Sequence, residues 1–81
     1  MSIDIRQETD KQRLNSILNE VMFAEIEGRE ITPYQITKKR LVTSKIADTY
    51  EYIDYLVKEL GSIRIEYRGN RKFLKVAHRG V

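Results

Sequence analysis

Basic and hydroxyl side chains in the C-terminal half of this sequence fall into three groups that could bind a polyanion. The first group consists of Lys38, Lys39, Arg40 and Thr43. The second consists of Ser44, Lys45, Thr49 and Tyr52. The third surrounds a glycine and consists of Arg68, Asn70, Arg71 and Lys72. Cationic and hydroxyl groups bind phosphate oxygens and the edges of bases, so these residues are candidate contacts to a nucleic acid.

The residue types that most enzymes use are scarce. The chain has one histidine, His78, and no cysteine, which excludes a multi-histidine metal site, thiolate ligands and a cysteine nucleophile. It also contains no glycine-rich phosphate loop and no Ser, His and Asp set that the elements below would bring together. We therefore expect neither an enzyme nor a cofactor, and no small-molecule ligand is evident.

The charge is distributed unevenly along the chain. Residues 1–37 carry four Lys and Arg against seven Asp and Glu, whereas residues 38–81 carry eleven against five. A basic C-terminal half favours a polyanionic partner, and a nucleic acid is favoured over a membrane. The alternative is a solvated surface whose charges are simply uneven.

Length and hydropathy limit which classes of protein this sequence can belong to. The 81 residues suffice for one small domain, and such a domain is marginally stable unless it forms oligomers. No apolar run approaches the ~20 residues that span a bilayer, and the N-terminal segment MSIDIRQETDKQ is too polar for a secretory signal. Together with the absence of cysteine, these features predict a cytoplasmic protein.

Two helices joined by a tight turn are predicted over residues 33–60. Thr32 can cap the first helix, and Pro33 suits its first turn because proline lacks the N–H that would be unpaired there. Thr43 or Ser44 can cap the second helix, and Gly61 ends it. Its inward residues would be Ile46, Tyr50, Ile53, Val57 and Leu60. A short helix, a turn and a longer helix form a helix-turn-helix candidate.

The preceding helix should run from Thr9 or Asp10 to about Glu27, after a possible flexible arm at residues 1–8. Its apolar stripe consists of Leu14, Ile17, Leu18, Val21, Met22 and Ile26. Phe23 widens this stripe, which either covers the core alone or also reaches a second subunit. Met22 and Phe23 are the candidate dimer contacts. Ile31 could form a short strand that pairs with the C-terminal hairpin.

That hairpin is predicted over residues 62–78, where the apolar period changes from helical to alternating. Ile63, Ile65 and Tyr67 would share one face of its first strand, and Gly69-Asn70 suits a tight turn. In the second strand Leu74 and Val76 share a face, and the register of the pairing stays open. Tyr50 and Tyr67 are expected in the core. Tyr52 and Tyr55 fall on the other side of the 44–60 helix. No aromatic array on a sheet favours stacking with single-stranded bases.

The segment TPYQITKKRLVTSKIADTYEYIDYLVKELGSI, in this order of elements, resembles the winged helix-turn-helix family of DNA-binding domains. Within it, "ITPYQI" resembles the start of the family's second helix, and "LVKELGSI" resembles the end of the third helix running into the wing. The resemblance covers about residues 10–78. It implies an α+β fold with three helices, a short strand after the first helix and a β-hairpin wing. The size is similar to that of small transcription regulators of archaea and of their viruses and plasmids.

The resemblance also implies a function: a sequence-specific double-stranded DNA binder, acting as a homodimer in transcription regulation, in the cytoplasm at the nucleoid or in the host cytoplasm if viral. Base contacts would come from the second group of residues above, phosphate contacts from the first, and contacts to the adjacent minor groove or backbone from the third. Asp48, Glu51 and Asp54 depart from this pattern because acids on the recognition helix repel phosphates. The alternative is a winged-helix module that binds an acidic protein.

Overall fold

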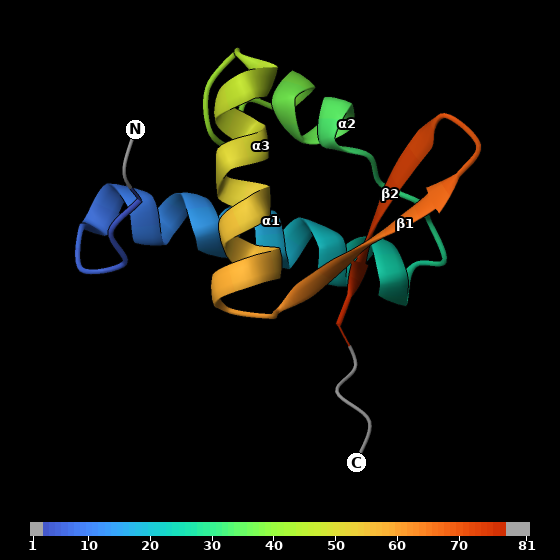
Figure 1. Cartoon of the computed structure of the whole chain (residues 1–81), viewed down its shortest axis with the longest axis horizontal. Coiled ribbons are helices and arrows are strands. Elements are labelled where there is room, and N and C mark those ends of the chain that lie inside the picture. The colour runs from blue at the N-terminus through green and yellow to red at the C-terminus, as the bar shows by residue number, and fades with distance from the viewer. Residues whose placement is uncertain (1–2, 78–81) are drawn as a thin grey trace.

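Three helices precede a two-stranded antiparallel hairpin in the computed structural model, which describes residues 3–77 (Figure 1). The helices are α1 (Glu8–Ile26), α2 (Pro33–Lys38) and α3 (Ile46–Asp54), and α3 continues into a π-helical turn, η1 (Tyr55–Glu59). The strands are β1 (Ile63–Arg68) and β2 (Arg71–Val76). The predicted α+β fold class, the order of the helices and the C-terminal hairpin are confirmed. His78 lies outside the described residues.

Helix α1 crosses behind α3 in Figure 1 and carries one side of the core. Its buried residues are Leu14, Ile17, Val21 and Ala24. The predicted stripe covers the core only in part, because Met22 and Ile26 are exposed and Leu18 is only partly buried. A step of four residues turns a helix by about 400°, so Leu18, Met22 and Ile26 rotate progressively away from the core.

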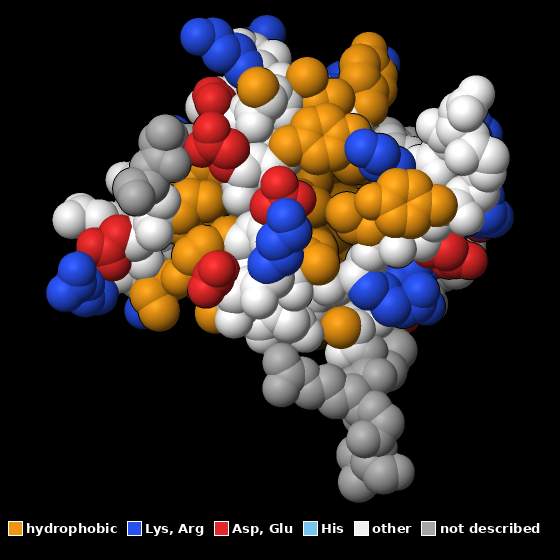
Figure 2. All heavy atoms as spheres, in the orientation of Figure 1, with side chains coloured by type: hydrophobic (Ala, Val, Ile, Leu, Met, Phe, Trp, Pro, Cys, Tyr) orange, Lys and Arg blue, Asp and Glu red, His pale blue; other side chains and the backbone are white. Residues whose placement is uncertain are grey.

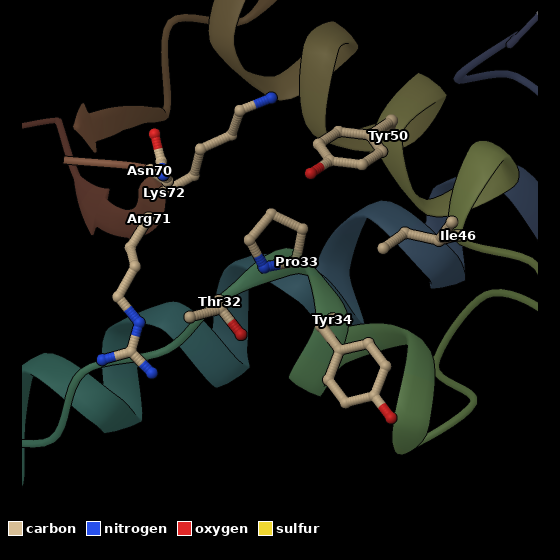
Figure 3. Close-up of a pocket in the computed structure, with 8 residues that line it drawn as sticks. All are labelled: Thr32, Pro33, Tyr34, Ile46, Tyr50, Asn70, Arg71 and Lys72. Carbon is tan, nitrogen blue, oxygen red and sulfur yellow. The ribbon is translucent and has the colours of Figure 1, made fainter. Parts of the chain in front are cut away.

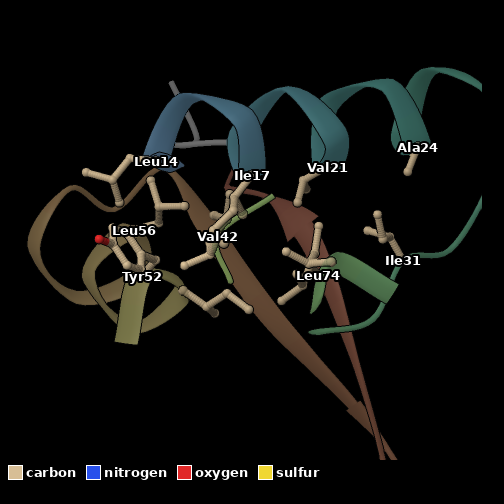
Figure 4. Packing of buried hydrophobic residues seen from close by; sticks show 12 residues of the cluster. Leu14, Ile17, Val21, Ala24, Ile31, Val42, Tyr52, Leu56 and Leu74 are labelled. Carbon is tan, nitrogen blue, oxygen red and sulfur yellow. The ribbon is translucent and has the colours of Figure 1, made fainter. Parts of the chain in front are cut away.

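The core lies between α1, the α2–α3 pair and the base of the hairpin. Figure 4 shows the buried α1 side chains facing residues of the other elements. Those residues include Ile31, Ile36, Val42, Tyr52, Ile53, Leu56, Ile63 and Leu74. Every element of the fold therefore contributes to one core, as expected for a domain of this size.

Helix α2 is short and well capped. The Thr32 hydroxyl accepts a hydrogen bond from the Gln35 backbone N–H at 3.3 Å, and the Gln35 side chain accepts from the Thr32 N–H at 2.9 Å. This reciprocal pair is a capping box, and Pro33 occupies the first helical position. The predicted cap at Thr32 is confirmed, and it fixes where α2 begins.

Helix α3 is rotated relative to the sequence-based expectation. Its buried residues, with those of η1, are Thr49, Tyr52, Ile53 and Leu56. Of the predicted inward residues only Ile53 is fully buried; Ile46 and Leu60 are exposed, and Tyr50 and Val57 are half-buried. The N-cap is Lys45, not Thr43 or Ser44. Gly61 follows the helix end with a φ of 60°, the left-handed conformation that glycine adopts readily.

The hairpin joins β1 and β2 through Gly69 and Asn70, and its register pairs Ile63 with Val76 and Arg68 with Arg71. A bridge joins Ile31 to Leu74, whose N–H donates to the Ile31 carbonyl at 2.8 Å. The predicted strand pairing of Ile31 is therefore confirmed. Tyr67 was expected in the core but is 65% exposed, because the hairpin extends beyond the core toward its tip.

Candidate nucleic-acid interface

The end of α2 presents three consecutive cations to solvent: Lys38, Lys39 and Arg40 are all exposed. Lys39 Nζ lies 2.7 Å from Glu20 Oε2 of α1, so this ammonium already has a partner. Arg40 follows the C-cap with a φ of 56°, a left-handed conformation that is unfavourable for residues other than glycine and asparagine. The structure thus places the predicted phosphate-binding residues of α2 at the surface, one of them in a strained position.

The turn before α3 orders its first residues through Thr43. The Thr43 hydroxyl accepts from the Lys45 backbone N–H at 3.0 Å and donates to Asp48 Oδ2 at 2.8 Å. Asp48 lies in the first turn of α3, where a carboxylate is stabilised by the helix dipole. These contacts give both residues a structural role, and they leave Ser44 and Lys45 exposed at the start of the helix.

Two of the four predicted base contacts are wrong. Thr49 and Tyr52 are fully buried and cannot reach a base edge. The Thr49 hydroxyl lies 2.7 Å from the Thr37 hydroxyl, which in turn lies 3.1 Å from the Pro33 carbonyl. These bonds join α3 to α2 across their interface and satisfy two buried polar groups.

The Tyr52 hydroxyl joins α3 to the start of α1. It donates to Asp10 Oδ1, and Arg13 Nη1 donates to it at 3.2 Å. The hydrogen bond from Tyr52 holds the pKa of Asp10 below its ordinary value, and burial raises the pKa of Tyr52. The other Asp10 oxygen accepts from the Asp4 N–H at 3.0 Å, which attaches residues 3–7 to α1.

The hairpin tip exposes the predicted wing residues, although its three cations all have intramolecular contacts. The Arg71 guanidinium carbon lies 6.0 Å from the centroid of the Phe73 ring. Arg68 lies 2.5 Å from Glu30 and stacks on Phe73, with 4.0 Å between the guanidinium carbon and the ring centroid. This ion pair raises the pKa of Arg68 and lowers that of Glu30. Lys72 Nζ lies 4.9 Å from the centroid of the Tyr50 ring. The wing tip is therefore attached to the helical part of the molecule.

Tyr34, in the first turn of α2, separates two hollows on one face of the molecule. One hollow is lined by Tyr34, Thr37, Lys38, Arg40 and Ser44. The other, about 310 Å³ in volume, lies toward the wing and is lined by Thr32, Pro33, Tyr34, Ile46, Tyr50, Asn70, Arg71 and Lys72 (Figure 3). In Figure 2 hydrophobic side chains gather over α2, α3 and the hairpin, with Lys and Arg among and around them.

Beyond its first turn, α3 turns acids toward solvent. Asp54 is exposed and Glu51 is partly exposed. One carboxylate oxygen of Glu51 is buried and meets no hydrogen-bond partner among residues 3–77. Because carboxylates repel phosphates, these two acids disfavour contact of a polyanion with α3 beyond its first turn.

The outer face of α1 carries a separate apolar patch. The predicted dimer contacts Met22 and Phe23 are 41% and 56% exposed, and Ile26 beside them is 78% exposed. All three lie within one and a half turns at the C-terminal end of α1, so they form one contiguous surface. Ile26 belongs to the stripe that the sequence predicts to cover the core, alone or together with a contact to a second subunit.

The sequence did not reveal the hollow beside the wing. Its walls come from α2, α3 and the hairpin tip, and only the tertiary fold brings these together. Pro33 and the exposed Tyr34, in the first turn of a capped helix, were the available signals. The Tyr34 side chain is 64% exposed, so its ring is available for contact with a ligand.

Comparison with protein-family models, curated proteins and solved structures gives no match. The arrangement of the elements is winged-helix-like: three helices, a bridge from the segment after α1 to β2, and a C-terminal hairpin. Over residues 3–77, no helix is long and apolar enough to cross a membrane, and no three His, Cys, Asp or Glu side chains are grouped to hold a metal ion.

Proposed function

We propose that this protein binds double-stranded DNA sequence-specifically and regulates transcription. The observation that carries the proposal is the pair of hollows flanking Tyr34. They place the cations of the α2 end, Lys38 and Arg40, on one side and those of the wing tip, Arg71 and Lys72, on the other. Two basic regions that flank the start of a helix suit the phosphates on the two sides of a groove.

In this proposal the first turn of α3 enters the major groove. Ser44 and Lys45 are exposed there and can donate to base edges, and Ile46, 41% exposed, can contact a thymine methyl group. The wing lies on the adjacent minor groove or backbone. The acids further along α3 limit its contact with the groove, so the wing supplies a large share of the affinity.

Arg40 gives independent support because of its backbone conformation. A left-handed residue other than glycine costs about 1–3 kcal/mol and is often found at functional sites. Arg40 lines the hollow next to Tyr34, where its guanidinium can pair with a phosphate. An arginine at a position that favours glycine is understandable if its side chain contributes to binding.

The protein would act as a homodimer in the cytoplasm, at the nucleoid or in a host cell. One module of this size buries only about 600–1,000 Å² on DNA, so a second half-site adds affinity and specificity. Met22, Phe23 and Ile26 on α1 are the surface available for a second copy. An exposed apolar patch of this kind commonly marks a protein contact.

The proposal is tested by selecting duplexes from a random library at two salt concentrations and measuring their affinities. We expect a preferred sequence and an affinity that falls steeply with salt. The double variant Arg71→Gln/Lys72→Gln should weaken binding to all duplexes and reduce the log–log salt slope by about 2. Lys11→Gln, on the exposed face of α1, is the matched control. Absence of duplex binding at low salt would contradict the proposal.

Arg40→Gly separates binding from stability. Glycine relieves the left-handed strain, so the melting temperature should rise by a few degrees, since about 1 kcal/mol corresponds to about 4–8 °C in a domain of this size. Loss of the guanidinium should weaken duplex binding at the same time. Equal affinities of the variant and the wild type would show that Arg40 takes no part in binding.

A second candidate function is a winged-helix module that binds an acidic protein through the basic face. Glu51 and Asp54 on α3 favour it, because they oppose an approach to DNA phosphates. A partner recovered by pull-down, together with a lack of duplex binding at low salt, would support this function over the first.

A further inference from the structure

The hollow beside the wing combines aromatic, apolar and cationic walls. Figure 3 shows Pro33 between the rings of Tyr50 and Tyr34, with Ile46 beside Tyr50 and the hairpin tip at the opposite end. Asn70, Arg71 and Lys72 are supplied by that tip. Tyr34 is 64% exposed and Tyr50 is half-buried, so ring surface is available to a ligand.

These walls match the parts of a nucleotide. Aromatic side chains stack on the flat face of a base, and Lys and Arg bind its phosphate. The side-chain amide of Asn70 offers one acceptor and two donors, which suits the edge of a base. A volume of about 310 Å³ is at the small end of the range for ligand sites, which run from about 300 to 1,000 Å³.

A fully paired duplex cannot use the ring surfaces of this hollow. Paired bases are stacked on one another, and only their edges are accessible in the grooves. The tyrosines can stack only on a base that has left the helix, or on one that was never paired.

We propose that the hollow holds one unpaired nucleotide of the bound DNA. Its base lies against Tyr34 and Tyr50 over the Pro33 floor, and its phosphate meets Lys72 and Arg71. This inference rests on the proposed function and specifies which DNA is bound best. In the free protein the Lys72 ammonium lies over the Tyr50 ring. A phosphate offers it a charge-assisted hydrogen bond, which is stronger than an exposed cation–π contact.

The proposal predicts a preference for DNA that already contains an unpaired nucleotide. Stacking of one base on an aromatic side chain contributes about 5- to 150-fold in affinity. Extraction of a paired base from the stack costs a comparable factor, so a perfect duplex gains little from the hollow. A bulged base has already been unpaired, and its stacking is therefore gained without that cost.

The test compares a 20-base-pair duplex with the same duplex carrying one bulged thymidine, by fluorescence anisotropy. The wild type should bind the bulged duplex about tenfold more tightly or better. Tyr34→Leu and Tyr50→Leu should reduce this ratio toward one. Tyr67→Leu, at an exposed tyrosine of β1 that does not line the hollow, is the matched control and should keep the ratio. Circular dichroism melts verify folding, and the exposed Tyr34 variant decides the question if Tyr50→Leu unfolds.

Equal affinity of the wild type for both duplexes would overturn the proposal, as would a bulge preference that survives in Tyr34→Leu. A five-residue thymidine oligonucleotide distinguishes this failure from failure of the proposed function. If it binds in a Tyr34-dependent manner while no duplex binds, the hollow takes a nucleotide and the duplex function is wrong. If neither the oligonucleotide nor any duplex binds, both proposals fail.

Discussion

Thr37→Val should destabilise the protein more than Thr49→Val, although the two substitutions remove the same atoms from the α2–α3 interface. A carbonyl can only accept, so the single hydroxyl hydrogen of Thr37 goes to the Pro33 carbonyl, and Thr37 accepts from Thr49. Thr37→Val therefore leaves the fully buried Thr49 hydroxyl without an acceptor. Thr49→Val removes the hydrogen bond between the two threonines and leaves the hydrogen bond from Thr37 to the Pro33 carbonyl in place.

The expected magnitudes follow from these contacts. A buried donor without a partner costs about 1–3 kcal/mol, whereas loss of one satisfied hydrogen bond costs about 0.5–1.5 kcal/mol. At about 4–8 °C per kcal/mol, Thr37→Val should lower the melting temperature by about 4–24 °C. The double variant replaces both partners by apolar groups of the same shape, so it should be more stable than Thr37→Val alone.

The wild type, the two single variants and the double variant form a double-mutant cycle. Their thermal and urea unfolding is monitored by circular dichroism. Thr9→Val, at an exposed position in the first turn of α1, controls for the general effect of this substitution in a helix. Two single effects that are equal, and that add to the double effect within about 0.5 kcal/mol, would refute the direction of the hydrogen-bond chain.

Three other predictions concern separate contacts. Thr32→Ala removes the α2 capping box and should cost about 1 kcal/mol, measured by urea unfolding, whereas an unchanged midpoint would show that the cap contributes nothing. The hydrogen bond from Tyr52 lowers the pKa of Asp10 below 3.8, so its stabilisation is present above pH 3.8 and is lost as the pH falls through the lower, folded-state pKa. The difference in melting temperature between the wild type and Tyr52→Phe should accordingly narrow below pH 3.8, and a constant difference would argue against this linkage. Phe23→Asp should convert a dimer to a monomer in sedimentation experiments, and a wild type that is monomeric at high concentration would remove α1 as the dimer surface.

Local signals were sufficient to predict the order of the elements. The Thr32 cap and the Gly69-Asn70 turn follow from side chains close to the feature in the sequence. These interactions act over a few residues, so one sequence is enough to detect them. The positions of the α2 and wing cations at the surface follow in the same way from their charge.

The buried face of α3 could not be predicted, because two stripes of residues at helical spacing were possible and both contain Ile53. The predicted stripe begins at Ile46 and Tyr50. The stripe that is buried contains Thr49 and Tyr52, whose hydroxyls find partners 12 and 42 residues away in the chain. Without knowledge of Thr37 and Asp10, a polar group is assigned to the surface. The π-helical turn at Tyr55–Glu59 also changes which of the following residues face the core, because it holds more residues than an α-helical turn.

The bridge between Ile31 and Leu74 has a consequence for how the chain folds. Leu74 belongs to the last described strand, so the segment before α2 gains its partner only after residue 74 has been synthesised. The buried residues of α2 and α3 belong to the same core as those of α1 and β2. Folding must therefore close long-range contacts early, which slows it. A fragment that ends at residue 61 should remain unfolded, and the basic face should form only when the hairpin has docked.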